Sequence, residues 1–256
     1  MSISRLILRA ANALVTFIVV IALLIAGTYS VYALWDNKQI YAEAENVKNE
    51  MLWLKPEIEN IEEGASFEEL LAINSDVCAW ITMDNTAIDF PVLQGETNHS
   101  YINTDVYGNF ALAGSIFLDS RNAKDFSDSY SLLYGHHMAN SNMFGDLDLY
   151  KNEKFFKENT TGILILPDRA YNLETYACLL VSASEDEIFS PLSWQQNIDG
   201  LLRYTKENAL YIRNEVHEEL KGQSDAKILA LSTCSSEFTD ARTIVLTVMK
   251  PYRSTE

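Results

Sequence analysis

The segment Ile228-Leu-Ala-Leu-Ser-Thr-Cys234 is an apolar run that ends in a cysteine. Arg242 follows eight residues later, immediately before a second apolar run at residues 243–249. Far upstream, Ser131-Leu-Leu-Tyr continues into Gly-His-His at residues 135–137. Short apolar runs between polar residues predict strands. A cysteine, a histidine and an arginine, each at a strand end, are the components of a thiolate acyl-transfer site.

These three residue types divide the chemistry of acyl transfer between them. Only the thiolate form of Cys234 is a nucleophile, and an unperturbed thiol with a pKa of about 8.5 is mostly protonated at neutral pH. A neighbouring histidine can accept that proton and later return it to a leaving amine. Arg242 cannot act as a base, but it can donate hydrogen bonds to a developing oxyanion. The residues alone also allow a core cysteine, a surface histidine and a solvated arginine.

Strand signals dominate the middle of the chain, where Asn, Asp, Gly and Pro separate short apolar runs. Strands at this density, without alternating helices, favour a closed antiparallel barrel. A helical segment follows, and then two last strands, one carrying Cys234 and the other following Arg242. The predicted strands are residues 79–82, 87–93, 115–118, 131–134, 162–166 and 173–182, and the predicted helical segment is residues 194–220.

The residues before the barrel have helical periodicity instead. Apolar residues recur at spacings of four and three from Ile40 to Ile58, which predicts a stalk or a helix packed on the domain. Pro56 is expected to break or restart this helix. Ser66-Phe-Glu-Glu has the pattern of a capping box, which predicts a short helix that ends near Ile73.

Residues 10–34 are almost entirely apolar, with Asn12 as the one strongly polar interruption. A helix of about 25 such residues can span about 30 Å of hydrocarbon, so the segment predicts a transmembrane anchor. A cleaved signal peptide is the alternative, although its apolar core would be shorter and would lack the aromatic residues that end this run. Arg5 and Arg9 predict a cytoplasmic N-terminus, with everything after Trp35 outside the cell.

The charge of the chain excludes one class of partner. The net charge is −17, and residues 1–35 contain Arg5 and Arg9 but no acidic residue. The remainder therefore has 17 basic and 36 acidic residues, a net charge of −19. A body this acidic has no general field that would attract the phosphates of a nucleic acid. Its simplest consequence is solubility, with a preference for cationic substrates as the alternative.

The cysteine count points in the same direction as the motif. Three cysteines in an exported domain leave at least one without an intramolecular disulfide. Cys78 and Cys178 lie inside apolar segments and are expected to be small buried residues, which leaves Cys234 as the functional thiol. A disulfide between Cys178 and Cys234 remains open at this point.

The order of these motifs resembles one family. Leu231-Ser-Thr-Cys234 followed by Arg242 resembles the signature of sortases, and Tyr134-Gly-His136 is similar to their histidine motif. The helical stripe before the barrel and the helix-bearing insertion after residue 182 fit class B, and no Asp-Pro-aromatic lid of the class C type precedes the barrel. Across about residues 65–250, the further segments that resemble class B are Trp80-Ile-Thr, Ile88-Asp-Phe-Pro-Val, Tyr101-Ile-Asn, Gly114-Ser-Ile-Phe-Leu-Asp and Met143-Phe-Gly-Asp-Leu.

The resemblance implies a mainly β fold with added helices. Its core would be a closed eight-stranded sortase-type β-barrel, with N-terminal helices and a helix in the loop before the cysteine strand. The implied organisation is a cytoplasmic N-terminus at residues 1–9, a single transmembrane helix at 10–34, a helical stalk at 35–64 and the catalytic barrel at 65–253.

By position in the motifs, the resemblance implies Cys234 as the nucleophile, His136 as the general acid/base and Arg242 as the stabiliser of developing charge. The motif places the catalytic ring directly after Gly135, which favours His136 over its neighbour His137. Among the remaining polar residues, Thr233 and Ser232 are expected to line the approach to the thiol and contact substrate, His99 and His217 to lie on the surface, and Glu237 to be a loop acid.

The implied reaction is that of a cysteine-type transpeptidase of Gram-positive bacteria, a thiol protease that can also hydrolyse. It would cleave a secreted protein after the Thr of a C-terminal Pro-x-Thr sorting motif, form a thioacyl intermediate and transfer the acyl group to an amine. The acceptor would be a peptidoglycan precursor or cross-bridge, or alternatively a pilin lysine. No cofactor or metal is expected, and the acidic residues show no spacing that resembles a calcium loop. An anchor would raise the effective concentration of the enzyme near both substrates at the membrane.

Other classes of protein remain as alternatives. Papain-like wall hydrolases place the cysteine before the histidine, which is the reverse of the order here. L,D-transpeptidases place the histidine first but use a Ser-x-Gly-Cys-x-Arg type sequence, which Ser232-Thr-Cys-Ser-Ser does not match. A non-catalytic, membrane-anchored binding or assembly module would have a buried, inert Cys234. The sorting motif, the accepting amine and the oligomeric state are not encoded in any motif of the sequence.

Overall fold

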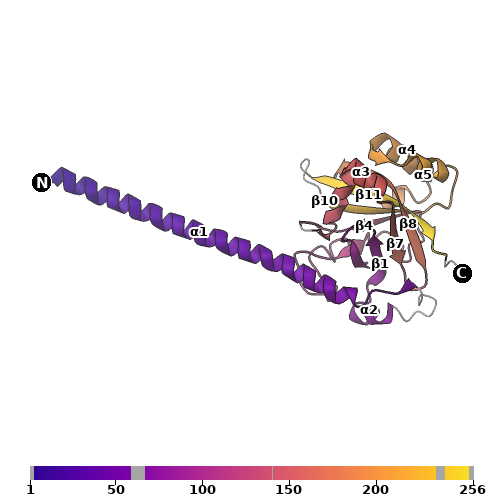
Figure 1. Ribbon diagram of the computed structural model, residues 1–256, viewed down its shortest axis with the longest axis horizontal. Helices are drawn as coiled ribbons and strands as arrows, with labels where there is room; N and C mark the ends of the chain where they lie inside the picture. The colour runs from indigo at the N-terminus through magenta and orange to yellow at the C-terminus, as the bar shows by residue number, and fades with distance from the viewer. Residues whose placement is uncertain (1–2, 59–66, 140, 235–239, 254–256) are drawn as a thin grey trace. The chain divides into compact units, whose positions relative to one another are not determined.

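The computed structural model describes residues 3–58, 67–139, 141–234 and 240–253, and for Cys234 it describes the backbone alone. The chain divides into two units, Met1–Glu43 and Ala44–Glu256. The long helix α1 (Ile3–Leu52) provides the described part of the first unit and ends inside the second (Figure 1). The predicted anchor and most of the predicted helical stripe therefore belong to one continuous helix.

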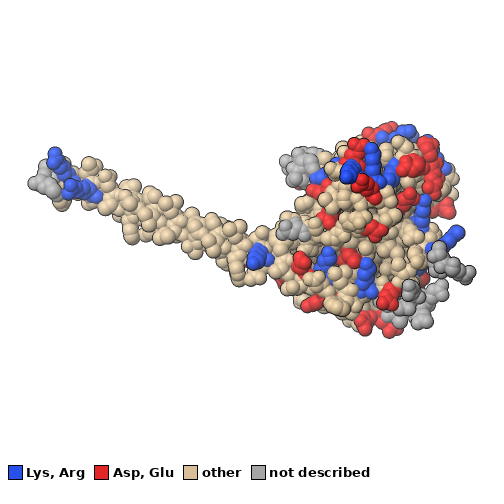
Figure 2. All heavy atoms as spheres, viewed as in Figure 1, with Lys and Arg blue, Asp and Glu red and all other residues tan. Residues whose placement is uncertain are grey.

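The first unit consists of the apolar part of α1. Its large side chains, among them Leu23, Ile25 and Val31, are about two-thirds exposed, and the helix is long and apolar enough to cross a membrane. Figure 2 shows the middle of this helix free of charged side chains. The hydroxyls of Thr28 and Ser30 donate to backbone carbonyls one turn earlier, at 2.8 Å each. These two hydroxyls are thus satisfied by the helix itself.

In the second unit, the last turns of α1 pack on the domain. Met51 is buried, and the Lys48 ammonium donates to the Ala87 carbonyl at 2.5 Å while lying 4.6 Å from the centre of the Phe90 ring. Burial lowers the pKa of Lys48. Lys55 forms an ion pair of 2.9 Å with Asp89. The helix ends at Leu52, four residues before Pro56, as the proline rule predicts.

Helix α2 (Glu68–Ile73) begins where a helix was expected. The residue before it, Phe67, forms no side-chain capping hydrogen bond. The predicted capping box depends on Ser66, which lies outside the described residues. The buried side chains of Phe67 and Leu70 join the same apolar cluster as Met51 and Trp80, so packing holds this helix in place.

Eight strands form a closed barrel in the order β11-β10-β4-β3-β2-β1-β7-β8, which β8 closes by pairing with β11 (Figure 1). The fold class expected from the resemblance is confirmed. The ninth strand of the sheet, β9, pairs with the C-terminal half of β8, beyond the point where β7 ends. The barrel strands are β1 (Val77–Met83), β2 (Asp89–Leu93), β3 (Ile116–Leu118), β4 (Tyr130–Tyr134), β7 (Thr161–Ile165), β8 (Ala170–Ser182), β10 (Ile228–Cys234) and β11 (Ala241–Pro251).

The barrel is mixed, so the expectation of a purely antiparallel barrel was wrong. β2 pairs with β3 in parallel, and so does β4 with β10. Parallel neighbours require a long connection that returns the chain to the same end of the sheet. Residues 94–115 make the first connection, and everything from β5 to α5 makes the second. Sequence periodicity marks strands but carries no information about which strands become neighbours.

The first part of the second connection, between β4 and β7, consists of short elements. The hairpin β5 (His137–Met138) and β6 (Asn142–Met143) directly follows His136 and leads into a 3-10 helix η3 (Gly145–Lys151) and α3 (Glu153–Glu158). Asn152 caps α3 by accepting a hydrogen bond from the backbone of Phe155 at 3.1 Å. These elements hold the histidine segment against one end of the barrel.

The helix-bearing insertion lies between β8 and β10, at residues 183–227. The predicted single helical segment is wrong in its middle, because the structure has η4 (Pro191–Ser193), α4 (Ile198–Asn208), strand β9 (Ala209–Ile212) and α5 (Asn214–Leu220). The sequence Ala-Leu-Tyr-Ile of β9 pairs with β8, so tertiary pairing overrides the local helical periodicity. Trp194, Leu201 and Leu202 pack into a core cluster with residues of β4, β8 and β10.

Candidate active site

The parallel pairing of β4 with β10 brings the histidine motif beside the cysteine motif. Ser232 is the register partner of Tyr134, and the backbone N–H of Gly135 donates to the Ser232 carbonyl at 3.1 Å. Two residues beyond that pair, the two segments carry His136 and Cys234. Residues far apart in the sequence are thus placed side by side by a backbone ladder.

The antiparallel pairing of β10 with β11 brings the arginine to the same place. Cys234 and Arg242 are direct register partners, and Thr233 is opposite Thr243. On its other edge, β11 pairs Arg242 with Val181 of β8. Arg242 is therefore the second residue of β11, and the expectation that it precedes the strand was wrong, because β11 begins two residues earlier than expected, at Ala241. The backbone of Cys234 lies between the segments of the histidine and the arginine.

A cavity of about 190 Å³ lies at this end of the barrel. It brings together four of the five residues predicted for the site, namely His136, Arg242, Thr233 and Ser232. The fifth, Cys234, is placed by its backbone alone. The remaining lining residues are Ile102, Phe117, Tyr134 and Gly135, which all belong to motif segments of the sequence but were not predicted as site residues.

His136 is half-buried, and its ring is oriented by the backbone. Nε2 lies 2.7 Å from the carbonyl oxygen of Ile102, and the His136 carbonyl accepts a hydrogen bond from Phe144 N at 3.1 Å. A nitrogen this close to a carbonyl must carry the proton, so the neutral ring leaves Nδ1 as its acceptor. That is the state in which an imidazole can accept a proton from a thiol.

Gly135 is required by the close packing under the histidine. A Cβ atom there would lie 2.4 Å from Cδ1 of Ile116 and 2.7 Å from Cδ2 of Phe144. Both neighbours belong to the buried core, so they have little room to move. The Gly-His dipeptide of the motif thus has a steric explanation: the backbone before His136 must approach the core too closely for any side chain.

His137 points to a different set of partners. Its ring is exposed, and Nε2 lies 3.1 Å from the Asp148 carboxylate, which also pairs with Lys151 at 2.9 Å and accepts from Thr243 Oγ1 at 2.9 Å. The cavity is lined by His136 and not by His137. The structure therefore separates the two adjacent histidines that the motif could confuse.

The other two histidines differ from each other. His99 is exposed, as expected. His217 was expected on the surface, but it is buried in the insertion, where Nδ1 lies 2.7 Å from the hydroxyl oxygen of Tyr176. Burial lowers the pKa of His217, and the neighbouring Lys221 acts in the same direction. The expectation failed because α5 docks this face on β8, which no local pattern records. Glu237 lies outside the described residues.

Thr233 and Ser232 contribute the floor of the cavity. Both are 2% exposed, and both lie on β10 immediately before the cysteine. The Thr233 hydroxyl has no hydrogen-bond partner among the described residues. A buried hydroxyl without a partner is costly unless a ligand or water satisfies it. Thr233 thus presents a buried hydroxyl that the described residues leave without a partner at this cavity.

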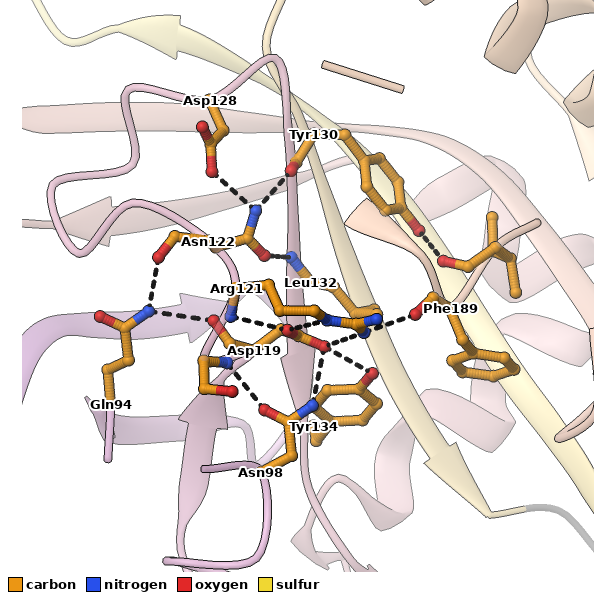
Figure 3. A network of polar contacts seen from close by, with 12 residues as sticks. Gln94, Asn98, Asp119, Arg121, Asn122, Asp128, Tyr130, Leu132, Tyr134 and Phe189 are labelled. Carbon is orange, nitrogen blue, oxygen red and sulfur yellow. Dashed lines mark hydrogen bonds and ion pairs between the residues drawn. The ribbon is translucent and has the colours of Figure 1, made fainter. Parts of the chain in front are cut away.

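Tyr134 also lines the cavity, and Asp119 holds its hydroxyl (Figure 3). The tyrosine hydroxyl donates to Asp119 Oδ2 at 3.0 Å, and its ring packs against Phe117 with centroids 5.3 Å apart. Burial and the nearby carboxylate raise the pKa of Tyr134, so the phenol remains a neutral donor. In the sequence, Asp119 is only the last residue of a motif segment, and no role was predicted for it.

The other two cysteines are unsuited to nucleophilic chemistry. Cys78 is buried in β1, where its thiol contacts the Val92 carbonyl at 3.4 Å, and burial raises the pKa of this thiol to about 12. Cys178 is a fully buried thiol of β8. A thiol with a raised pKa is almost never a thiolate at neutral pH. Both residues match the expectation of small buried side chains.

The chain resembles proteins of one family over most of its length. No family model matches it. Sortase B of Staphylococcus aureus is 28% identical over 239 residues, which cover 93% of this chain and 95% of the relative. Sortase B of Listeria monocytogenes is 30% identical over 169 residues, covering 66% of this chain and 67% of the relative. A Streptococcus pyogenes class B sortase involved in pilus biogenesis is 36% identical, with a TM-score of 0.66 over 73% of this chain and 100% of the solved one.

Because the chain has a closed mixed barrel and is similar to sortases over most of its length, it is a cysteine transpeptidase. The chain belongs to the class B sortases.

Proposed function

We propose that this chain is a membrane-anchored extracellular sortase that cleaves secreted proteins at a Pro-x-Thr sorting motif and transfers them to a cell-wall amine. In this proposal Cys234 is the nucleophile, His136 the general acid/base and Arg242 the electrostatic stabiliser. The observation that supports it best is the strand register, which sets Arg242 opposite Cys234 while β4 delivers His136 to the same cavity.

The first half of the reaction forms a thioester. His136 Nδ1 accepts the thiol proton of Cys234, and the thiolate attacks the carbonyl carbon of the motif's Thr. The carbonyl oxygen becomes an oxyanion, to which the Arg242 guanidinium donates hydrogen bonds. When the intermediate collapses, the bond between Thr and the following residue breaks. The protonated His136 gives its proton to the departing amine, and the acyl group stays on sulfur.

The second half returns the enzyme to its starting state. An amine of the cell wall attacks the thioester, and His136 accepts the proton that the amine loses. The carbon–sulfur bond breaks, the Cys234 thiolate leaves, and the proton on His136 returns it to the thiol. Water in place of the amine gives hydrolysis. Thr233, whose hydroxyl has no hydrogen-bond partner in the described part of the chain, and Ser232 are proposed to contact the bound peptide near the thiol.

The proposed location follows from the apolar helix. Residues 10–34 would span the membrane, with residues 1–9 inside the cell and the barrel at 65–253 outside on a stalk formed by residues 35–64. Support comes from the exposed apolar surface of α1 and from Arg5 and Arg9, the basic residues before the span. Protease added to intact protoplasts should digest the barrel, whereas an inside location would protect it.

A second acceptor is a pilin lysine. It is supported by the likeness to a Streptococcus pyogenes class B sortase involved in pilus biogenesis. The two acceptors differ in the amine they present, so the thioacyl enzyme can be offered a peptidoglycan cross-bridge peptide and a lysine-bearing pilin domain in competition. The amine that is incorporated faster identifies the acceptor.

The decisive experiment is cleavage by the full-length chain in detergent micelles, with a library of Pro-x-Thr-Gly and Pro-x-Thr-Asn peptides as the probe. Cys234→Ala should abolish cleavage, because no other group in the proposed mechanism forms the acyl intermediate. Iodoacetamide should label Cys234 and leave the buried Cys78 largely unmodified. Cleavage that persists in Cys234→Ala would contradict the proposal.

A further inference from the structure

The start of the insertion is held by three consecutive backbone carbonyls, each of which accepts a hydrogen bond from a side chain. Trp194 Nε1 donates to the Glu187 carbonyl at 2.6 Å, the Tyr130 hydroxyl to the Ile188 carbonyl at 2.9 Å, and Arg121 Nη2 to the Phe189 carbonyl at 2.7 Å. Tyr130 belongs to β4, and Arg121 to the connection between β3 and β4. Side-chain donors, together with the buried side chain of Ile188, therefore join residues 187–189 to the catalytic domain.

Arg121 is aimed at Phe189 by a buried carboxylate (Figure 3). Asp119 Oδ1 accepts from Arg121 Nε at 2.8 Å and from the Arg121 backbone N–H at 3.0 Å, while Oδ2 accepts from Nη2 at 2.7 Å. Asn98 Nδ2 and the Tyr134 hydroxyl donate to Oδ2 as well, at 2.9 and 3.0 Å. The hydrogen bonds from Nε and Nη2 to the two carboxylate oxygens fix the plane of the guanidinium. They therefore also fix the direction of the bond from Nη2 to the Phe189 carbonyl.

The ring of Phe189 packs on a residue that lines the site. It stacks on Tyr134 with centroids 6.5 Å apart and an interplanar angle of 15°. Tyr134 lines the same cavity as His136 and Arg242. Asp119 therefore holds both partners of this stack: Tyr134 through its hydroxyl, and Phe189 through Arg121.

We propose that Arg121 is a positioning residue for substrate binding. It holds Phe189 against Tyr134 and thereby fixes the apolar wall of the active site, so the insertion contributes to peptide binding only while this tether is intact. The inference rests on the proposed function, because the wall is that of the proposed active site. Arg121 should consequently affect how tightly the peptide binds and leave the reactivity of the thiol unchanged.

The test compares four variants of the full-length chain in detergent with the library peptide that the wild-type enzyme cleaves fastest. Arg121→Ala and Phe189→Ala should each raise KM about tenfold and change kcat less than about threefold. Each removes peptide binding that is equally strong in the ground state and in the transition state. In the double variant the two effects should overlap and not multiply, because Arg121 acts through Phe189. The fourth variant, Arg203→Ala, removes an exposed arginine of the insertion helix and should leave KM unchanged.

Phe189→Ala keeps the proposal testable if Arg121→Ala unfolds the domain, because it leaves the bonds between Arg121 and Asp119 in place. The rate of iodoacetamide labelling at Cys234 should equal that of the wild-type chain in every folded variant. An unchanged KM in Phe189→Ala, multiplicative effects in the double variant, or slower labelling of Cys234 would each overturn the inference. Failure of the proposed function is a separate result, in which Cys234→Ala would still cleave the peptide.

Discussion

The end of the barrel that carries the site and the insertion beside it are held in place by different means. Cys234 and Arg242 are set by the ladder between β10 and β11, and His136 follows two residues after the last pair of the ladder between β4 and β10. The start of the insertion is held by donors on single side chains, with Arg121 and Tyr130 supplying those from the barrel. A ladder fixes a register for every residue it contains, whereas a side-chain tether can be changed by one substitution. We infer that the first arrangement suits the reaction and the second suits the choice of substrate.

The largest expected effect separates the two neighbouring histidines at the barrel end. His136→Ala should lower kcat/KM for the cleaved peptide by about 10²–10⁴-fold, the contribution of a general acid/base. His137→Ala is the matched control, because it removes an adjacent ring that lies against the carboxylate of Asp148. Steady-state kinetics of the two full-length variants measure the difference. Equal losses in both variants would remove His136 from the chemistry.

A smaller effect is expected on the opposite strand. Arg242→Lys keeps the positive charge but removes the planar fork, so cleavage should fall by about 10²-fold if two hydrogen bonds to the oxyanion are needed. The loss should appear in kcat, because the oxyanion exists only in the transition state and intermediate. Near-wild-type turnover in Arg242→Lys would make the arginine a structural partner of β8 and β10.

The smallest effect lies where the two regions meet, at Asp119. Burial alone would raise the pKa of this carboxyl, but the hydrogen bonds from Arg121 and Asn98 outweigh burial and hold the pKa below its usual value. A carboxyl with a lowered folded-state pKa stabilises the fold above its unfolded pKa of about 3.9, and that contribution is lost as the pH falls through the folded value. The free energy of unfolding should therefore fall more steeply below about pH 4 in the wild-type chain than in Asp119→Asn.

Urea unfolding followed by tryptophan fluorescence between pH 7 and pH 3 measures this difference. Tyr134→Phe serves as an intermediate control, because it removes one donor to Asp119 and leaves both bonds from Arg121. A stability difference between wild type and Asp119→Asn that stays constant across this range would contradict the proposed network.

Much of the barrel was accessible from local pattern. Each of the six upstream strands predicted from apolar runs exists within a few residues of its expected bounds, because alternation and turn residues are local signals. The buried state of Cys78 and Cys178 followed from their apolar surroundings. The prediction failed where a distant partner decided the outcome, as at residues 209–212, which pair with β8, and at His217, which docks on Tyr176.

The sequence alone determined the strands, the apolar helix and the three residue types at strand ends, because these depend on the chemistry of neighbouring residues. The motifs also indicated the family, which the comparisons confirmed. Only the tertiary structure decided that β4 and β10 run in parallel, that Ile102 and Phe117 line the cavity beside His136, and that Asp119 and Arg121 join the insertion to the site. These features arise from contacts between segments separated by tens of residues. Such contacts depend on chain topology, which local periodicity does not specify.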